Sequence, residues 1–326
     1  MTQTSWAQQV TNRFFSDRKS PSQIQCDEIA RSVSGASIVS PVDSPGSMSY
    51  TVICNGYPSP QHDLIVSFRE PGAMLDGKIV KLAKEIHGDL VPESTYHGNV
   101  EGADPPLLIY SMPYLGGSSY IEAMAFQVEM DSAEEAMHRV FVRHLARYFA
   151  RCWFNPLSVD HQTQAKHQKR IRMNLSRLME ELPPSILPSS MLSLLIENLP
   201  LLFSPDYPQV LTHGDFSVTN ILVDENKFEI TGIVDWSLAA VMPFGMDLDI
   251  LFLATGFMTR DGWHDYSCKL LLQDTFWEEF WAASGIEGEE HRKRTQCLAE
   301  NAGRLDFTVG KKQLKAWFGE QAACPT

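Results

Sequence analysis

The sequence predicts an α+β fold with two lobes, a small β-rich lobe at the N-terminus and a larger, mainly helical lobe after it. Three observations support this prediction. The chain has 326 residues, which at roughly 150 residues per domain corresponds to about two domains. Segments typical of strands concentrate before residue 113, and long amphipathic segments typical of helices follow residue 120. We expect an N-terminal lobe over residues 1–112, a C-terminal lobe over residues 113–326, and a hinge at about 110–117.

The N-terminal lobe is expected to begin with helices and to continue with a pair of strands. Residues 6–33 carry apolar positions at helical spacing, and Pro21 interrupts them. Residues 49–54 are rich in β-forming side chains and end at Asn55-Gly56, which is a hairpin signal. Residues 63–69 form the second expected strand.

A helix and a further strand complete the expected N-terminal lobe. The helix covers residues 74–87, and Gly88 is suited to end it. Its expected apolar face consists of Leu75, Ile79, Leu82 and Ile86. Residues 107–112 form a buried strand that leads into the hinge.

The C-terminal lobe is expected to be helical apart from one β-rich insert. Helical patterns cover residues 132–153, 161–182 and 189–199, and they resume after the insert to about residue 318. The insert covers residues 209–236 and contains two short strands, 220–223 and 229–234, that a tight turn joins into a hairpin.

The charge and the apolar runs limit the partners that this chain can have. Lys and Arg total 27 against 40 Asp and Glu, a formal net charge of −13. Proteins that bind nucleic acid need clustered positive charge, so no nucleic-acid partner is expected. The longest apolar runs, such as residues 250–254, are far shorter than the ~18 residues of a membrane span. Residues 1–19 contain no secretory signal, and no membrane partner is expected.

The cysteines and histidines predict neither a disulfide framework nor a zinc site. No CxxC spacing occurs, which favours free thiols in a reducing cytosol and a cytoplasmic protein. The six cysteines are Cys26, Cys54, Cys152, Cys268, Cys297 and Cys324. The histidine pairs His138 with His144 and His161 with His167 have a spacing that does not bring both rings to one helical face.

One segment combines the side chains that phosphate and metal chemistry needs. Asp215 lies in a loop just before the expected hairpin, and Asn220 and Asp235 stand at opposite ends of its paired strands. The pairing would therefore bring Asn220 and Asp235 near each other. Carboxylate and amide oxygens are hard donors, which suit Mg²⁺ together with phosphate oxygens. The sequence therefore predicts that Asp215, Asn220 and Asp235 converge on one small volume that suits Mg²⁺.

These residues resemble the motifs of a known family. His213-Gly214-Asp215 followed by Asn220, and then Val234-Asp235-Trp236 after a hairpin, is similar to the aminoglycoside phosphotransferase and choline kinase group. The resemblance is greatest to the fungal-type phosphotransferase members and covers roughly residues 26–255. That group shares the protein-kinase-like fold, and the Asp-to-Asn spacing also matches the protein kinase catalytic loop. The resemblance implies a bilobal kinase-like fold with ATP and Mg²⁺ as cofactors.

The resemblance implies roles for the residues of the motif. Phosphoryl transfer depends on positioning and on charge neutralisation more than on covalent catalysis. Asp215 would orient the acceptor group and accept its proton, and His213 would brace the loop through hydrogen bonds. Asn220 and Asp235 would hold the Mg²⁺ ions that bridge the ATP phosphates.

The resemblance also implies where ATP binds. Backbone N–H groups around Gly46 and Ser47, in a turn over residues 44–50, would cover the phosphates, because glycine permits a close backbone approach. The hinge strand, which includes Met112, would offer backbone hydrogen bonds to adenine.

The segment after the hairpin is expected to support the site. Pro243-Phe244-Gly245 matches a further feature of the family. Asp247 and Asp249 are interpreted as capping or supporting residues and not as catalytic ones. The small-molecule acceptor would bind between Asp215 and the helices on either side of the β-rich insert.

The chain departs from the family at the usual phosphate-binding cation. A basic residue on the third strand normally contacts the α- and β-phosphates, and a helical Glu holds it. Here Ser67 stands at that position, and Arg69 lies on the same strand face about 6–7 Å further on. The next helix has no Glu at the corresponding place. Lys78 could supply the charge, although Lys78, Lys81 and Lys84 fit better as a solvated helix face.

Two function hypotheses follow. The first is an ATP- and Mg-dependent phosphotransferase that acts on a hydroxyl or amine of a small molecule. The alternative is a protein that keeps the kinase fold but has lost ATP phosphotransfer, and binds a small molecule or catalyses a different reaction in the same cleft. Ser67 supports the alternative, whereas the metal-type oxygens of Asp215, Asn220 and Asp235 support the first. Nothing in the sequence indicates the acceptor or the oligomeric state.

Overall fold

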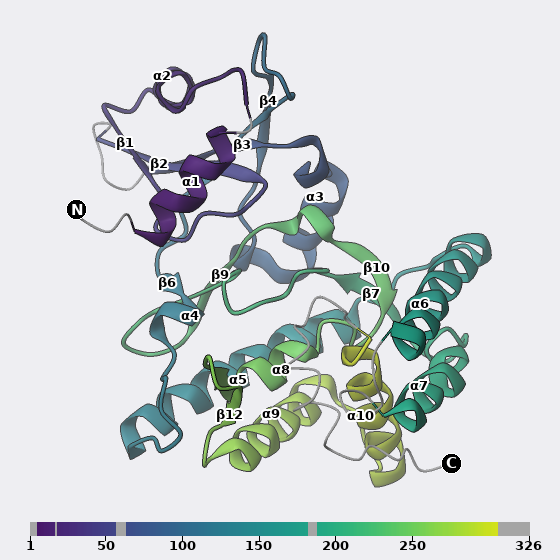
Figure 1. The fold of residues 1–326 in the computed structure, drawn as a ribbon. Helices are drawn as coiled ribbons and strands as arrows, with labels where there is room; N and C mark the ends of the chain where they lie inside the picture. The colour runs from purple at the N-terminus through teal and green to yellow at the C-terminus, as the bar shows by residue number, and fades with distance from the viewer. Residues whose placement is uncertain (1–4, 17, 57–62, 182–187, 306–326) are drawn as a thin grey trace. The chain divides into compact units, whose positions relative to one another are not determined.

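The computed structural model describes residues 5–16, 18–56, 63–181 and 188–305, and it confirms the predicted α+β class (Figure 1). The chain forms two compact units. The first runs to Ser119 and also includes Thr231–Leu238, and the second comprises Tyr120–Ile230 and the chain from Ala239 onward. Each unit is described by itself below.

The first unit is built on a five-stranded antiparallel sheet in the order β1-β2-β3-β5-β4. Its strands are β1 (Ile38–Pro41), β2 (Ser49–Asn55), β3 (Leu64–Arg69), β4 (Thr95–Asn99) and β5 (Leu108–Pro113). The sequence predicts β2, β3 and β5. It misses β4, because the side chains of this edge strand are mostly exposed and show no apolar alternation. The short strand β6 (Ser118–Ser119) follows at the end of this unit.

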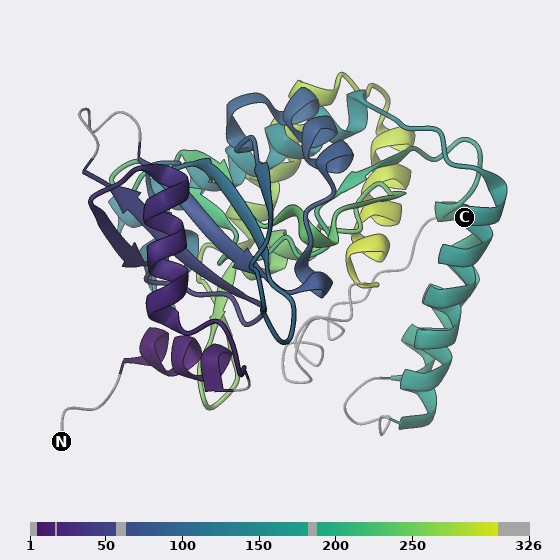
Figure 2. The ribbon, with the colours of Figure 1, turned by 90° about the horizontal axis from the view of Figure 1, so that it is seen from above.

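Two N-terminal helices cover one face of this sheet, α1 (Trp6–Ser16) and α2 (Gln23–Ser34) (Figure 2). The break between them is where Pro21 predicts it, and Ser22 and Gln25 form a capping box at the start of α2. Their apolar side chains share one core with alternate residues of the central strands. Its members include Phe14, Cys26, Ala30, Tyr50, Val52, Val66, Phe68 and Ile109.

The opposite face of the same strands, here called the polar face, carries Thr51, Ser67 and Arg69 beside apolar residues such as Ile65. Thr51 of β2 pairs in register with Ser67 of β3, and Ser67 pairs with Tyr110 of β5. Because successive side chains of a strand point to opposite faces, Ser67 and Arg69 lie on the face away from the apolar core. Both are buried, with 0% and 6% of their surface exposed.

The helix after β3 starts later than expected, and its most buried residues lie one position beyond the predicted ones. A turn of 3₁₀ helix, η2 (Pro71–Ala73), comes first, and α3 spans Gly77–His87 with Asp76 as its N-cap. Val80, Ala83 and His87 are its buried residues. Of the predicted apolar face, Leu75 is buried just before the helix, and Ile79, Leu82 and Ile86 are half-buried. A second 3₁₀ turn, η3 (Gly88–Leu90), follows at the predicted stop.

The second unit is mainly helical, as predicted. Its helices are α4 (Tyr120–Ala123), α5 (Ser132–Phe154), α6 (His161–Glu181), α7 (Ser189–Leu202), α8 (Asp249–Leu253), α9 (Lys269–Ser284) and α10 (Glu289–Gly303). α5 and α9 pack along each other in its centre (Figure 1). Phe149 of α5, Phe244 and the α9 residues Phe276 and Phe280 form an aromatic core, so the aromatic spacing in α9 serves packing.

Short strands provide the framework of the β-rich insert. β7 (Gln209–Thr212) pairs antiparallel with β10 (Ala240–Pro243). β8 (Ile221–Val223) and β9 (Ile230–Ile233) confirm the two predicted hairpin strands, with the backbone N–H of Asp224 donating to the carbonyl of Glu229 across the turn at 3.0 Å. The hairpin of β11 (Gly256–Met258) and β12 (Trp263–Asp265) was not predicted, since the segment was expected to be helical. The predicted helical stretch beyond residue 305 lies outside the described residues.

The cysteine prediction holds at four positions. Cys26, Cys54, Cys152 and Cys268 are free thiols, whereas Cys297 is disulfide-bonded. The expectation of free thiols throughout is therefore wrong at Cys297. Within the described part of the chain, no helix has both the length and the apolar character needed to cross a membrane.

Candidate active site

The loop after β7 carries the first group of predicted site residues, His213, Asp215 and Asn220. His213 is fully buried, and Gly214 has a φ of 78°, a conformation that glycine adopts without strain. The carboxylate of Asp247, itself 5% exposed, accepts the backbone N–H of His213 at 2.6 Å and that of Gly214 at 3.1 Å. Charge-assisted bonds of this kind are about twice as strong as neutral ones, so they hold the loop firmly.

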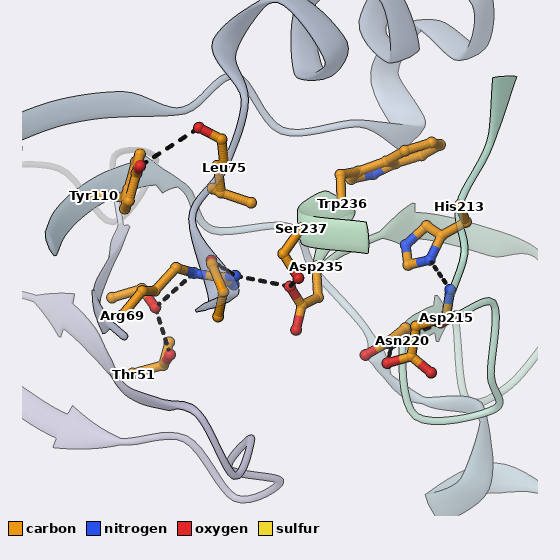
Figure 3. Close-up of polar contacts among 12 residues, drawn as sticks. Thr51, Arg69, Leu75, Tyr110, His213, Asp215, Asn220, Asp235, Trp236 and Ser237 are labelled. Atoms are coloured by element: carbon orange, nitrogen blue, oxygen red, sulfur yellow. Dashed lines mark hydrogen bonds and ion pairs between the residues drawn. The ribbon is translucent and has the colours of Figure 1, made fainter. Parts of the chain in front are cut away.

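Asn220 and His213 hold Asp215 in position. The amide nitrogen of Asn220 donates to the backbone carbonyl of Asp215 at 2.8 Å and to its Oδ2 at 3.2 Å. The backbone N–H of Asp215 donates to Nδ1 of His213 at 3.3 Å (Figure 3). A ring nitrogen that accepts carries no proton, so in this geometry His213 positions the loop through Nδ1. The Asp215 carboxylate is only partly buried and is within reach of a substrate.

The second group of site residues lies in the first unit and is centred on Asp235. Its φ of 65° is in the left-handed region, which Asp tolerates better than most residues. Oδ1 of Asp235 accepts the guanidinium Nη1 of Arg69 at 2.7 Å and the hydroxyl of Ser237 at 2.9 Å (Figure 3). Next to it, the Trp236 indole N–H donates to the carbonyl of Ile233 at 3.0 Å, which anchors the turn.

Arg69 is built into the polar face of the sheet. It is 6% exposed, and its Nε donates to the hydroxyl of Ser67 at 3.2 Å. Its Nη1 also donates to the carbonyl of Ala73 at 3.1 Å. The Ser67 hydroxyl in turn shares a hydrogen bond with Thr51 at 2.9 Å. Ser67 therefore stabilises the arginine, and Arg69 is the cation that the structure brings to Asp235.

The lysines of α3 take no part in this arrangement. Lys78 and Lys81 are exposed, and Lys84 forms an ion pair with Asp89 at 3.4 Å. These contacts match the solvated helix face that the sequence favours. The helix has no Glu at the place expected for pairing with a cation on β3, and Arg69 of β3 pairs with Asp235 instead.

The predicted nucleotide-binding backbone lies in the first unit. Gly46 and Ser47 are exposed in the connection between β1 and β2. The N–H of Glu70 donates to the carbonyl of Met48 at 3.0 Å, which ties this connection to the end of β3. Met112 is half-buried in β5, opposite Ile65 of β3.

Pro243-Phe244-Gly245 packs the core of the second unit. Gly245 has a φ of 91°, and a Cβ on it would stand 2.6 Å from the Cα of Ala299 in α10. Only glycine fits this approach. The carbonyl of Phe244 accepts the Tyr207 hydroxyl at 3.0 Å. The segment therefore sets the path of the chain toward Asp247, which binds the backbone of His213 and Gly214.

The donor types of Asn220 and Asp235 fit Mg²⁺. The amide nitrogen of Asn220 is used by Asp215, so its oxygen is the atom suited to a cation. In the part of the chain that the structure describes, no group of three or more His, Cys, Asp or Glu gathers as a metal site. Mg²⁺ is usually bound by only one or two protein carboxylates together with phosphate oxygens and water, so it does not require such a cluster. Asn220 and Asp235 belong to different units, and their convergence stays a prediction.

The buried histidine of α5 is a core residue. The Tyr120 hydroxyl lies 2.7 Å from Nδ1 of His138, and burial lowers the pKa of His138 to about 4. The ring is therefore neutral at pH 7 and shares this hydrogen bond with the tyrosine. This geometry agrees with the expectation that His138 is not a zinc ligand.

Sequence reasoning missed several contacts of the site. Ser237 and the pairing of Arg69 with Asp235 carry no motif in the sequence, and only the fold reveals them. Asp247 was expected to have a supporting role, and the structure shows which backbone groups it binds.

Comparisons with known proteins identify the family of the chain and its fold. Residues 78–293, more than half of the chain, match the phosphotransferase enzyme family. No curated protein matches the chain in sequence. The similar solved structures include the GDP complex of aminoglycoside 2'-phosphotransferase-IIIa, at 18% identity and a TM-score of 0.55, with 92% of this chain and 95% of that chain covered.

Two further solved structures share the fold. A putative aminoglycoside phosphotransferase from Ralstonia eutropha has 13% identity and a TM-score of 0.52, with 91% of this chain and 94% of that chain covered. Macrolide 2'-phosphotransferase type I has 15% identity and a TM-score of 0.50, with 94% and 99% covered. At these identities the likeness shows the fold, which is the predicted kinase-like one.

Proposed function

Since the chain belongs to the phosphotransferase enzyme family, we propose that it transfers the γ-phosphate of ATP, with Mg²⁺, to a hydroxyl or amine group of a small molecule. The observation that carries this proposal is the Asp215 loop. A partly exposed carboxylate is held by Asn220, and the buried carboxylate of Asp247 fixes the backbone before it. An ordinary surface turn does not require a buried carboxylate to fix its backbone, so this support favours a functional role for the loop.

The proposed chemistry assigns one step to each group. The Asp215 carboxylate orients the acceptor and takes its proton while the acceptor atom bonds to the γ-phosphorus and the bond to ADP breaks. Asn220 and Asp235 would hold Mg²⁺, which supplies neutralisation of the phosphate charge when bound. Arg69 adds a fixed positive charge for the phosphates. This buried arginine on β3 would supply the charge that a lysine at the position of Ser67 supplies in the family.

The nucleotide is proposed to lie along the first unit. The backbone of Gly46 and Ser47 would contact the phosphates, and that of Met112 the base. One of the solved relatives is a GDP complex, so guanine nucleotides are included in the test below. A hydroxyl-bearing acceptor is the first choice, since the names of the solved relatives refer to aminoglycosides and macrolides.

Calorimetry with ATP or GTP, in the presence and absence of Mg²⁺, tests the proposal. We expect Mg-dependent nucleotide binding, followed by release of ADP or GDP when a suitable acceptor from a panel of amino sugars, macrolides and amino alcohols is added. A folded protein that binds neither nucleotide at millimolar concentration would show that the alternative, a kinase fold without ATP phosphotransfer, is correct.

A further inference from the structure

The N-terminal helices of the first unit are connected to the end of β3 by a partly buried ion pair. α1 and α2 lie on the apolar face, opposite Ser67 and Arg69 (Figure 2). They also lie outside residues 78–293, which match the family. Arg18, in the connection between α1 and α2, is the residue that reaches from this layer to the end of β3.

Arg18 is fixed from several sides. Its side chain is 1% exposed, and its guanidinium lies 4.1 Å from the ring centroid of Phe14. One nitrogen, Nη1, donates to the carbonyl of Pro105 at 3.2 Å. The other, Nη2, forms an ion pair with the carboxylate of Glu70. Three contacts therefore hold the guanidinium, which is itself buried, whereas the Glu70 carboxylate is 34% exposed.

Glu70 is the residue next to Arg69. Its backbone is extended, with φ −64° and ψ 155°, so the side chains of Arg69 and Glu70 point to opposite sides of the chain. Arg18 therefore holds the dipeptide from one side while Asp235 binds Arg69 on the other. The same Glu70 donates its backbone N–H to Met48, in the connection that contains Gly46 and Ser47.

We propose that Arg18 is a positioning residue for the nucleotide phosphates: its ion pair with Glu70 fixes the direction of Arg69 and the position of the β1–β2 connection. The inference rests on the proposed function, since it assigns Arg69 to the phosphates. It gives the connection between α1 and α2 an indirect role in nucleotide binding.

The test compares Arg18→Met with two controls. Arg18→Met keeps the length of the side chain and removes the ion pair. Lys19→Met removes the neighbouring ion pair with Asp104, whose side chains are 88% and 68% exposed, and exposed pairs contribute little. Val52→Ala lowers stability in the same layer without touching a polar link, because Val52 is fully buried in the shared core.

We expect Arg18→Met to raise the Kd and the KM for Mg-ATP roughly tenfold, within the usual range of coupling between linked sites. The KM for the acceptor should not change. Arg18→Lys should restore part of the affinity, and Glu70→Gln should add little to Arg18→Met, because both remove the same pair. Neither control should change the affinity for ATP.

Two results would overturn the proposal. One is an unchanged Kd for ATP in Arg18→Met. The other is a loss of ATP affinity in Val52→Ala equal to that in Arg18→Met, when the two variants have the same melting temperature. If the wild-type protein binds no nucleotide, the proposed function fails by itself. Hydrogen exchange at the Glu70 amide then still tests the role of Arg18. Faster exchange in Arg18→Met than in Val52→Ala supports the proposal that Arg18 positions the β1–β2 connection, and equal exchange refutes it.

Discussion

The two carboxylates that we place in the reaction are held in different ways. Asp215 is held by its neighbours in the chain, with Asn220 five residues away and His213 two residues away. Asp235 is held by Arg69, which is 166 residues away on a strand of the N-terminal sheet. The first arrangement is encoded in a short motif, whereas the second forms only when the strand and the turn reach the same unit.

This difference has a chemical consequence. The Oδ2 of Asp215 accepts a hydrogen bond from the neutral amide of Asn220, which does not neutralise its charge, as a group that accepts a proton requires. The Oδ1 of Asp235 already binds a cation, the Arg69 guanidinium. Binding of Mg²⁺ at Asp235 is therefore expected to depend on Arg69, and binding of the acceptor at Asp215 is not.

The largest effect is expected for Asp215→Ala. Loss of a general base costs about 10²–10⁴-fold in rate, and kcat should fall by that factor while the Kd for Mg-ATP stays close to the wild-type value. Steady-state kinetics and calorimetry measure the two quantities. Asp206→Ala, at an exposed carboxylate of the same unit, serves as the control. Wild-type turnover in Asp215→Ala would disprove the assigned mechanism.

Asp235→Ala and Arg69→Met should affect the nucleotide instead. Asp235→Ala removes a metal ligand and should weaken Mg-dependent ATP binding at least about tenfold.

Arg69→Met removes a hydrogen bond to a charged group, worth about 1.5–3 kcal/mol, and should weaken ATP binding with and without Mg²⁺. Calorimetry at several Mg²⁺ concentrations separates the two.

The double variant of Arg69 and Asp235 tests whether their ion pair takes part in nucleotide binding. Because Arg69 and Asp235 bind each other, the double variant should lose less affinity than the sum of the single variants. Strict additivity would show that the ion pair has no part in nucleotide binding.

A smaller effect is expected for Asp247→Asn, which tests whether the Asp215 loop depends on a distant support. The amide replaces one of the oxygens that accept the N–H groups of His213 and Gly214, so a buried donor loses its partner. Such a loss costs about 1–3 kcal/mol of stability. We expect a lower melting temperature and a kcat reduced a few-fold, with ATP binding unchanged. A weakened Kd for ATP would show that the two carboxylate sites are not independent.

The sequence predicted the fold where local patterns are strong. The long helices, the strands β2, β3 and β5, and the hairpin strands β8 and β9 follow from periodicity and turn residues. Predictions were less accurate where neighbouring elements decide burial: α3 buries Val80 and Ala83 fully, whereas the predicted Ile79 and Leu82 are half-buried. The edge strand β4 and the β11–β12 hairpin have no clear alternation, and they form because adjacent elements offer hydrogen bonds.

By itself, the sequence determined the α+β class, the loop of His213, Asp215 and Asn220, and the kind of chemistry that such oxygens support. These follow from contacts between residues close together in the chain. Only the tertiary structure decided that Arg69 pairs with Asp235 and that Arg18 pairs with Glu70. The physical reason is that an ion pair depends on distance in space, and no spacing in the sequence records which strand and which turn will meet.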